Sequence, residues 1–230
     1  MKPLISESED SNALRVLGRA TVQIVHDLKN QLNGLKLYAT FLRKRMEKRD
    51  GPADELETIR KLISGLDRTA TDLSLIVEYG QPLELEKSTG TDLAKIMTAV
   101  ASSLSDGLSP GPALAESIVI DGQSGPMIGE FDSARLSKAL KSISLGAMKL
   151  ITNKPPQQKL TIHLKSELIE ARRNGVIEWQ GFHALDHDPF HSFAGSDEIR
   201  MSLAARIVEA HGGSAERQDG ALRVRLPLST

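Results

Sequence analysis

Two long amphipathic segments separated by a short break constrain the fold of this chain more than any other feature. Between Ala13 and Arg49 the apolar residues recur at alternating spacings of three and four, which is typical of helices that pack along a continuous seam. This seam consists of Leu14, Leu17, Thr21, Ile24, Leu28, Gln31, Leu35, Tyr38 and Leu42, and a parallel stripe of Val25, Leu32, Ala39 and Met46 widens it on one side. From Ala53 to Tyr79 a second seam follows the same spacing, through Leu56, Ile59, Ile63, Leu66, Ala70, Leu73 and Val77.

The tripeptide Asp50-Gly51-Pro52 separates the two segments. Glycine can end a helix in the left-handed conformation, and proline can open the next helix. Because the turn is so short, the two helices must be antiparallel neighbours. Their seams are wider than one neighbour can cover, so we expect a homodimer in which two hairpins form a four-helix bundle.

After Gly80-Gln81-Pro82 the pattern changes to mixed helices and strands. We expect a helix capped by Asp132, and a hairpin turn at 172–175 because Asn-Gly favours such turns. The further expected elements are helices over 92–102, 132–152 and 197–211, and strands over 117–120, 159–169, 176–182 and 221–226. The predicted class is α+β, with three parts: a disordered leader over 1–12, a long antiparallel helical hairpin over 13–82 and an α/β sandwich over 89–230.

Composition excludes several classes of protein. The formal net charge is −1 and aromatic residues make up 3% of the chain, which argues against nucleic-acid binding and against an acidic membrane surface. Cysteine is absent, so disulfides, thiolate nucleophiles and cysteine-based zinc sites are excluded. No apolar run approaches the ~20 residues of a membrane span, and the first residues lack a secretory signal. We therefore expect a cytoplasmic protein with no nucleic-acid or membrane partner.

Of the six histidines, His26 lies in the most informative context. It is two residues from the seam positions Ile24 and Leu28, which is about 200° of helix rotation, so it should point away from the seam. One interpretation is a solvated surface histidine. The other is a nucleophile, because a neutral imidazole can attack a phosphoryl group through Nε2 when the proton is held on Nδ1. Asp27 could hold that proton, and Asn30, at i+4, could position a water or a phosphoryl oxygen.

The segment His26-Asp27-Leu28-Lys29-Asn30-Gln31-Leu32-Asn33-Gly34 resembles the phosphoacceptor box of the sensor histidine kinases of two-component systems. In that family the box lies on the first helix of a dimeric hairpin, and an ATP-binding α/β domain follows. The resemblance implies that His26 is phosphorylated, that Asp27 assists the transfer, and that Asn30 positions water for dephosphorylation of a response regulator. Lys29 could contact an acidic receiver partner, or it could simply be a solvated lysine.

The second half of the chain resembles the ATP-binding domain of the same family without its nucleotide contacts. Residues 132–149 match the framework of the asparagine-box helix, but the two magnesium-binding asparagines fall on Ser142 and Gly146. Serine and glycine supply neither an amide oxygen nor its reach. The D-x-G-x-G box expected after the strand at 176–179 has no counterpart in 180–184.

A third nucleotide-binding feature of the family is also missing. The glycine pair that should precede the last helix falls on Glu198 and Arg200. Long charged side chains there would fill the space in which a glycine backbone cradles phosphates, and Glu198 would repel a triphosphate. The resemblance therefore implies the fold of an ATP-binding domain without ATP as a cofactor.

His183, His187 and His191 are spaced four residues apart with two aspartates between them. On a helix this spacing would suit a metal ion. Pro189 and the flanking glycines favour a polar loop instead, so we expect no metal site.

The predicted function is histidine phosphotransfer. His26 would exchange a phosphoryl group with response-regulator receiver domains, and any Mg²⁺ would be held by the receiver. One alternative is an active ATP-dependent histidine kinase with divergent nucleotide boxes. Another is a non-enzymatic module that binds or dephosphorylates a response regulator.

Overall fold

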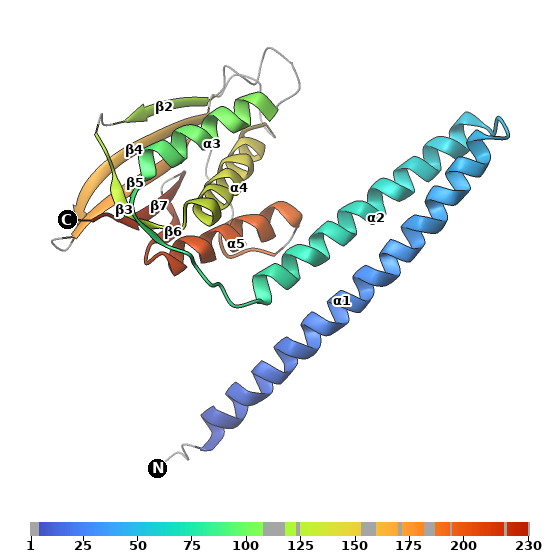
Figure 1. Cartoon of the computed structure of the whole chain (residues 1–230), viewed down its shortest axis with the longest axis horizontal. Helices are drawn as coiled ribbons and strands as arrows, with labels where there is room; N and C mark the ends of the chain where they lie inside the picture. The colour runs from blue at the N-terminus through green and yellow to red at the C-terminus, as the bar shows by residue number, and fades with distance from the viewer. Residues whose placement is uncertain are drawn as a thin grey trace. The chain divides into compact units, whose positions relative to one another are not determined.

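The computed structural model describes residues 5–107, 118–122, 125–152, 160–169, 172–181, 187–193, 195–218 and 220–229 (Figure 1). The chain divides into two compact units, Met1–Pro82 and Leu83–Thr230. The second unit begins before the predicted residue 89, because the Glu86 N–H donates a hydrogen bond to Asp132 Oδ2 at 3.0 Å.

The first unit is the predicted helical hairpin. Helix α1 spans Ile5–Glu47 and helix α2 spans Ala53–Gly80, and the two run side by side in opposite directions (Figure 1). Pro52 directly precedes α2, as expected. In the turn, Asp50 takes the left-handed conformation with φ 49°, whereas the sequence predicts Gly51 in this role. Aspartate is one of the non-glycine residues that tolerate this conformation.

The predicted disordered leader over 1–12 is wrong from residue 5 onward, because α1 already begins at Ile5. Residues 1–4 lie outside the described part of the chain. Neither glycine nor proline interrupts 5–17, so the polar composition of this segment does not prevent helix formation.

The two apolar stripes of α1 have different environments. Val25 and Ala39, which belong to the widening stripe, are the buried residues among those hairpin side chains that the structure describes, at 7% and 4% exposure. All the predicted seam residues of α2 are half-buried. The predicted main seam of α1 is instead exposed within one chain, at 43–68%, for Ile24, Leu28, Leu35, Tyr38 and Leu42. No described helix is long and apolar enough to cross a membrane.

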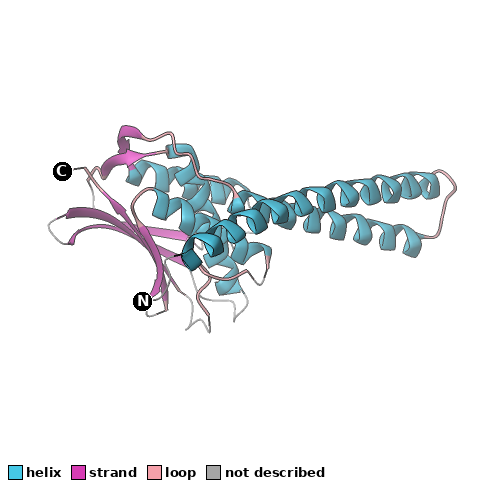
Figure 2. Cartoon of the chain, turned by 90° about the horizontal axis from the view of Figure 1, so that it is seen from below, coloured by secondary structure: helices cyan, strands magenta, loops and turns pink. Residues whose placement is uncertain are grey.

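The second unit is a five-stranded sheet with helices on one face (Figure 2). The strand order is β2-β4-β5-β7-β6, and only the β2–β4 pair is parallel. A separate antiparallel pair is formed by β1 and β3. The strands are β1 Ser88–Asp92, β2 Ile118–Gly122, β3 Ile128–Phe131, β4 Leu160–Ile169, β5 Arg172–Gln180, β6 Ser214–Gln218 and β7 Ala221–Pro227, and the helices are α3 Leu93–Gly107, α4 Ser133–Thr152 and α5 Ser196–Ala210.

The core of this unit lies between the sheet and its helices. Along β4 the residues Leu160, Ile162 and Leu164 are buried and alternate with more exposed ones, as the sequence pattern predicts. Trp179 of β5 is fully buried, and its Nε1–H donates a hydrogen bond to Ser144 Oγ of α4 at 2.9 Å. This bond satisfies the one polar atom of the indole inside an apolar core.

The predicted turn at 172–175 is wrong. Ile169 pairs with Arg172, so the hairpin closes before this segment, and Asn174 and Gly175 lie inside β5. A Cβ on Gly175 would lie 2.7 Å from Leu93 Cδ2, so the glycine permits close packing against α3. The pattern also missed β1, β3 and β6, which are short and have little apolar alternation.

A buried histidine connects α4 and α5. Asp132 Oδ1 accepts a hydrogen bond from the Arg135 N–H at 3.0 Å, which confirms the predicted N-cap of α4. The Asp132 N–H donates to His211 Nε2 at 3.0 Å, and His211 Nδ1–H donates to the Ile207 carbonyl at 2.7 Å. His211 is 2% exposed and neutral in this arrangement, since one ring nitrogen donates and the other accepts. Burial lowers the pKa of His211 below its ordinary value of 6.5.

This lowered pKa predicts a loss of stability in mild acid. Below 6.5 the unfolded chain binds a proton at this position and the folded chain does not, so the free energy of unfolding falls until the pH reaches the folded pKa. We expect wild type to lose stability between about pH 7 and pH 5, and His211→Asn to lose less over the same range. Denaturant unfolding, monitored by the fluorescence of the single tryptophan, Trp179, measures the free energy of unfolding of both proteins at each pH. Equal pH slopes in the two proteins would contradict the assignment.

Asp132 does not contribute to the loss of stability that His211 causes in mild acid. Its burial raises the pKa, but backbone hydrogen bonds from Arg135 and Glu86 outweigh this, and the pKa of Asp132 lies below 3.8. The stability that depends on its charge is therefore lost only at lower pH than the effect of His211.

Candidate functional site

His26 lies on α1, with its side chain 63% exposed. Its Nδ1 atom lies 3.4 Å from Asn30 Nδ2 and 3.7 Å from Asp27 Oδ1. The Asp27 carboxylate also accepts a hydrogen bond from Gln23 Nε2 at 3.1 Å. The structure therefore brings together the three residues that the sequence singled out, and both contacts of the ring are made at Nδ1.

The two neighbours favour different tautomers of His26. A hydrogen bond from the Asn30 amide requires a lone pair on Nδ1, which places the proton on Nε2. The Asp27 carboxylate can only accept, so it favours the proton on Nδ1 and leaves the lone pair on Nε2. The Asp27-directed tautomer is the one that can attack an electrophile through the exposed side of the ring.

Lys29 lies three residues after His26 and is half-buried. Among the described residues it forms no ion pair, whereas Lys36, further along α1, pairs with Asp67 of α2 at 2.6 Å. Residues at i and i+3 are neighbours on a helix surface, so Lys29 can place a positive charge close to the imidazole.

Two exposed apolar residues that the sequence analysis did not single out share the His26 face of α1. Leu37 and Phe41 are 53% and 60% exposed, and they follow His26, Asn30 and Asn33 at helical spacings of three and four. The sequence could have indicated this apolar surface, because Leu37 and Phe41 are apolar residues that lie outside both apolar stripes of α1.

A second group of predicted positions lies on α4 and α5, which are joined by an ion pair of 2.6 Å between Lys149 and Asp197. Ser142 is half-buried, and Gly146 is buried under Met201 of α5. A Cβ on Gly146 would lie 2.9 Å from Met201 Cγ and closer still to its sulfur. Met201 therefore fills the space that a side chain at position 146 would need. Because Met201 is far from Gly146 in the sequence, no local pattern predicted this contact.

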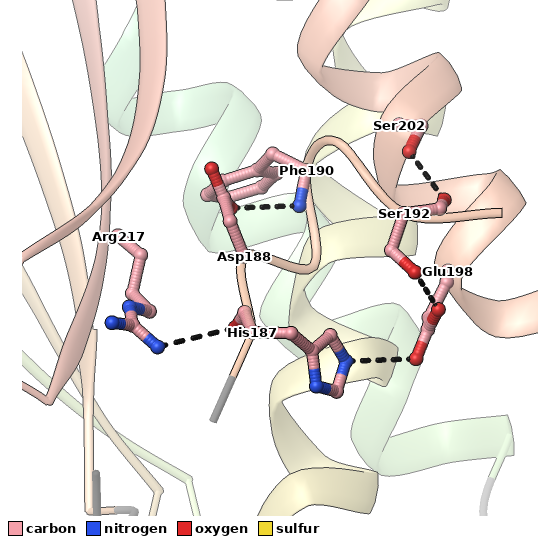
Figure 3. Close-up of polar contacts among 7 residues, drawn as sticks. All are labelled: His187, Asp188, Phe190, Ser192, Glu198, Ser202 and Arg217. Carbon is pink, nitrogen blue, oxygen red and sulfur yellow. Dashed lines mark hydrogen bonds and ion pairs between the residues drawn. The ribbon is translucent and has the colours of Figure 1, made fainter. Parts of the chain in front are cut away.

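Glu198 and Arg200 both make contacts within the protein. His187 Nε2 lies 2.9 Å from Glu198 Oε1, and Ser192 Oγ donates a hydrogen bond to Glu198 Oε2 (Figure 3). Arg200 Nη1 lies 3.3 Å from Asp197 Oδ1. The polar groups at the start of α5 are thus bonded to one another and to the preceding segment.

These residues do not fit a magnesium-bound nucleoside triphosphate. The space beside Gly146 is filled by Met201, and a carboxylate, Glu198, occupies the first turn of α5 where phosphate would need donors. Within the described ranges, no three acidic or histidine side chains come together to hold a metal ion. Of the histidine series, His187 and His191 bond to Glu198 and Asp188, and His183 lies outside the described residues.

No family model matches the sequence, and no curated protein matches it. Solved structures do resemble the chain. Full-length ShkA in complex with AMPPNP has a TM-score of 0.64 and 18% identity over 92% of this chain and 46% of that one. The histidine kinase ThkA, in complex with the response regulator TrrA, has a TM-score of 0.58 and 18% identity over 100% of this chain and 68% of that one. The histidine kinase AdeS of Acinetobacter baumannii has a TM-score of 0.52 and 17% identity over 84% of this chain and 94% of that one.

The chain has the fold of a histidine kinase. Its helical hairpin and the following helix-covered sheet correspond to the dimerisation and ATPase domains of that architecture, which confirms the predicted fold class. The chain spans less than half the length of ShkA.

Proposed function

We propose that this chain is a histidine phosphotransfer protein of a two-component system. His26 accepts a phosphoryl group from the aspartyl phosphate of a receiver domain and passes it to a second receiver, without ATP. The observation that carries the proposal is the exposed imidazole of His26 with Asp27 and Asn30 at Nδ1. The filled space beside Gly146 supports the exclusion of ATP.

The transfer step balances with the groups present. The negative charge of Asp27, 3.7 Å from Nδ1, favours the proton there, and the Nε2 lone pair of His26 attacks phosphorus. The bond between phosphorus and the acyl oxygen breaks as the N–P bond forms, and the receiver aspartate leaves as a carboxylate. The phosphorylated ring then carries positive charge, which the Asp27 carboxylate stabilises. Mg²⁺ belongs to the receiver, and this chain supplies position and charge.

Lys29 and Asn30 flank the transferred group. The Lys29 ammonium, which has no ion pair among the described residues, offsets the charge of the phosphoryl oxygens. In this proposal the Asn30 amide leaves Nδ1, which it contacts at 3.4 Å in the structure, and donates to a phosphoryl oxygen during transfer. The exposed Asn30 amide beside His26 is the observation that keeps a phosphatase activity as second candidate, because a water bonded to this amide would remove the phosphoryl group from the receiver.

Two exposed faces of α1 suit two partners. The main seam, including Leu35, is apolar and unburied within one chain, and a second copy of the hairpin would cover it. The His26 face carries Leu37 and Phe41, and a receiver docked over His26 would cover these residues.

Leu35 and Leu37 provide a matched pair to separate the two partners, because they are 54% and 53% exposed and lie on different faces. We expect Leu35→Glu to convert a dimer to a monomer by light scattering, because it buries a charge in the proposed bundle. We expect Leu37→Glu to remain dimeric and to need about tenfold more receiver for the same transfer rate. A dimer unaffected by Leu35→Glu would exclude the main seam as the interface.

The proposed function is tested by adding labelled phosphoreceiver to the purified chain and then an unlabelled second receiver. We expect the label to appear on this chain and then on the second receiver. Faster loss of receiver phosphate with no label on this chain would support the phosphatase candidate instead, and Asn30→Ala should then abolish that loss. Across a panel of receivers, neither gain nor faster loss of label would contradict both candidates.

A further inference from the structure

The segment 187–193, which follows β5 and precedes α5, is held by side chains of two other elements (Figure 3). Arg217 Nη1 of β6 donates to the His187 carbonyl at 3.2 Å. Ser202 Oγ of α5 donates to the Ser192 carbonyl at 2.8 Å. Between these points Phe190 is 2% exposed, so an apolar anchor also fixes the segment.

The segment also has its own internal bonds. Asp188 Oδ1 accepts a hydrogen bond from the Phe190 N–H at 3.0 Å, and Asp188 Oδ2 lies 2.8 Å from His191 Nδ1. The His191 N–H donates to the Asp188 carbonyl at 3.3 Å. These bonds form a turn in which the N–H groups of Phe190 and His191 are engaged within the protein.

Glu198 joins this segment to α5 through both of its carboxylate oxygens. Oε1 contacts His187 Nε2 and Oε2 contacts Ser192 Oγ, so the two ends of the segment converge on one side chain (Figure 3). An ionised carboxylate only accepts hydrogen bonds, so the imidazole and the hydroxyl both donate. Glu198 lies in the first turn of α5, where the helix dipole favours its negative charge.

We infer that the cluster of His187, Ser192 and Glu198 holds the segment 187–193 on α5 in place of a bound nucleotide. The segment is thus fixed at the start of α5 by side chains of this chain, and added nucleotide does not change it. The inference deepens the proposed function and rests on its exclusion of ATP. It adds that the carboxylate at 198 has a structural role in the space where a nucleotide-binding domain would receive phosphate.

Hydrogen exchange on the full chain tests this inference, with Mg-ATP as the probe ligand. In wild type we expect the amides of Phe190 and His191 to be protected without nucleotide and unchanged by Mg-ATP. Glu198→Ala should exchange at least about tenfold faster in 187–193, with no change in β4 and β5. The matched control is Asp197→Ala, one residue away, which removes a carboxylate that bonds Lys149 and Arg200 instead. The control should keep the wild-type protection.

Three results would overturn the inference. These are unprotected amides in wild type, protection that appears only with Mg-ATP, and equal effects of Glu198→Ala and Asp197→Ala. If Glu198→Ala fails to fold, as judged by the fluorescence of buried Trp179, Ser192→Ala removes one of the two donors and should give an intermediate increase in exchange. Unchanged exchange in a folded Ser192→Ala would count against the cluster.

Phosphoryl transfer to His26, measured on the same preparations, separates this inference from the proposed function. A protected segment in a protein that takes no phosphoryl group would contradict the function alone. A labelled His26 in a protein whose segment is unprotected would contradict the cluster alone.

Discussion

Replacement of His26 by glutamine is expected to abolish uptake of phosphoryl groups from a receiver, with a loss of about 10³-fold or more in rate. Glutamine retains a polar side chain of similar reach near Asp27 and Asn30, but it has no nucleophilic nitrogen. Label transfer from a phosphoreceiver measures the rate. The matched control is His191→Gln, because that imidazole is 65% exposed against 63% for His26. The control should transfer normally, and residual transfer in His26→Gln would place the acceptor elsewhere.

Replacement of Asp27 is expected to give a smaller loss of transfer at the same site. Asp27→Asn removes the negative charge that favours a proton on Nδ1 and stabilises the phosphorylated ring. We expect the transfer rate to fall by about 100-fold while receiver binding is retained. A change in binding with no change in the transfer step would mean that Asp27 contacts the receiver and does not orient His26.

The largest expected effect on stability comes from Gly146→Asn, which introduces the residue type that resembles the kinase pattern. Met201 is 2% exposed and already fills the space beside Gly146, so the new side chain must displace a packed methionine. We expect a loss of about 3 kcal/mol in the free energy of unfolding, by denaturant unfolding followed with Trp179. Ser142→Asn is the control, because position 142 is half-buried and should accept the change with a smaller loss.

A double substitution tests the physical cause. Met201→Ala alone should destabilise the unit by opening a cavity, and combined with Gly146→Asn it should cost less than the sum of the two. Additive losses would show that Met201 is not what excludes a side chain at position 146. Even the double variant should not bind Mg-ATP, because Glu198 still bonds to His187 and Ser192.

Local sequence signals predicted the hairpin, the α4 cap and the alternation along β4, because each depends on residues close in sequence. They did not predict which apolar stripe of α1 would face α2, since both have helical spacing. Gly175 was misread as a turn residue because its close neighbour, Leu93, is distant in sequence. The acidic start of α1 was misread as disorder because composition outweighed the absence of helix breakers.

The contacts at the candidate sites also fall into two kinds: those between residues close in sequence, which could be predicted, and those that depend on tertiary packing, which could not. His26, Asp27 and Asn30 lie within one helical turn, so helix geometry alone predicted their proximity. Met201 over Gly146 and His187 on Glu198 depend on tertiary packing between α5 and other elements. The absence of nucleotide binding at these positions stays a prediction, and the structure adds that Met201 fills the space beside Gly146.

The most direct test of the account compares two phosphoryl donors on one protein. Wild type and His26→Gln are incubated with labelled Mg-ATP, and separately with a labelled phosphoreceiver, and the modified residue is mapped by mass spectrometry. We expect label on His26 from the receiver and none from Mg-ATP. Label on His26 from Mg-ATP alone would contradict this expectation and would identify the chain as a kinase that binds nucleotide without the asparagine and glycine boxes of the histidine kinases.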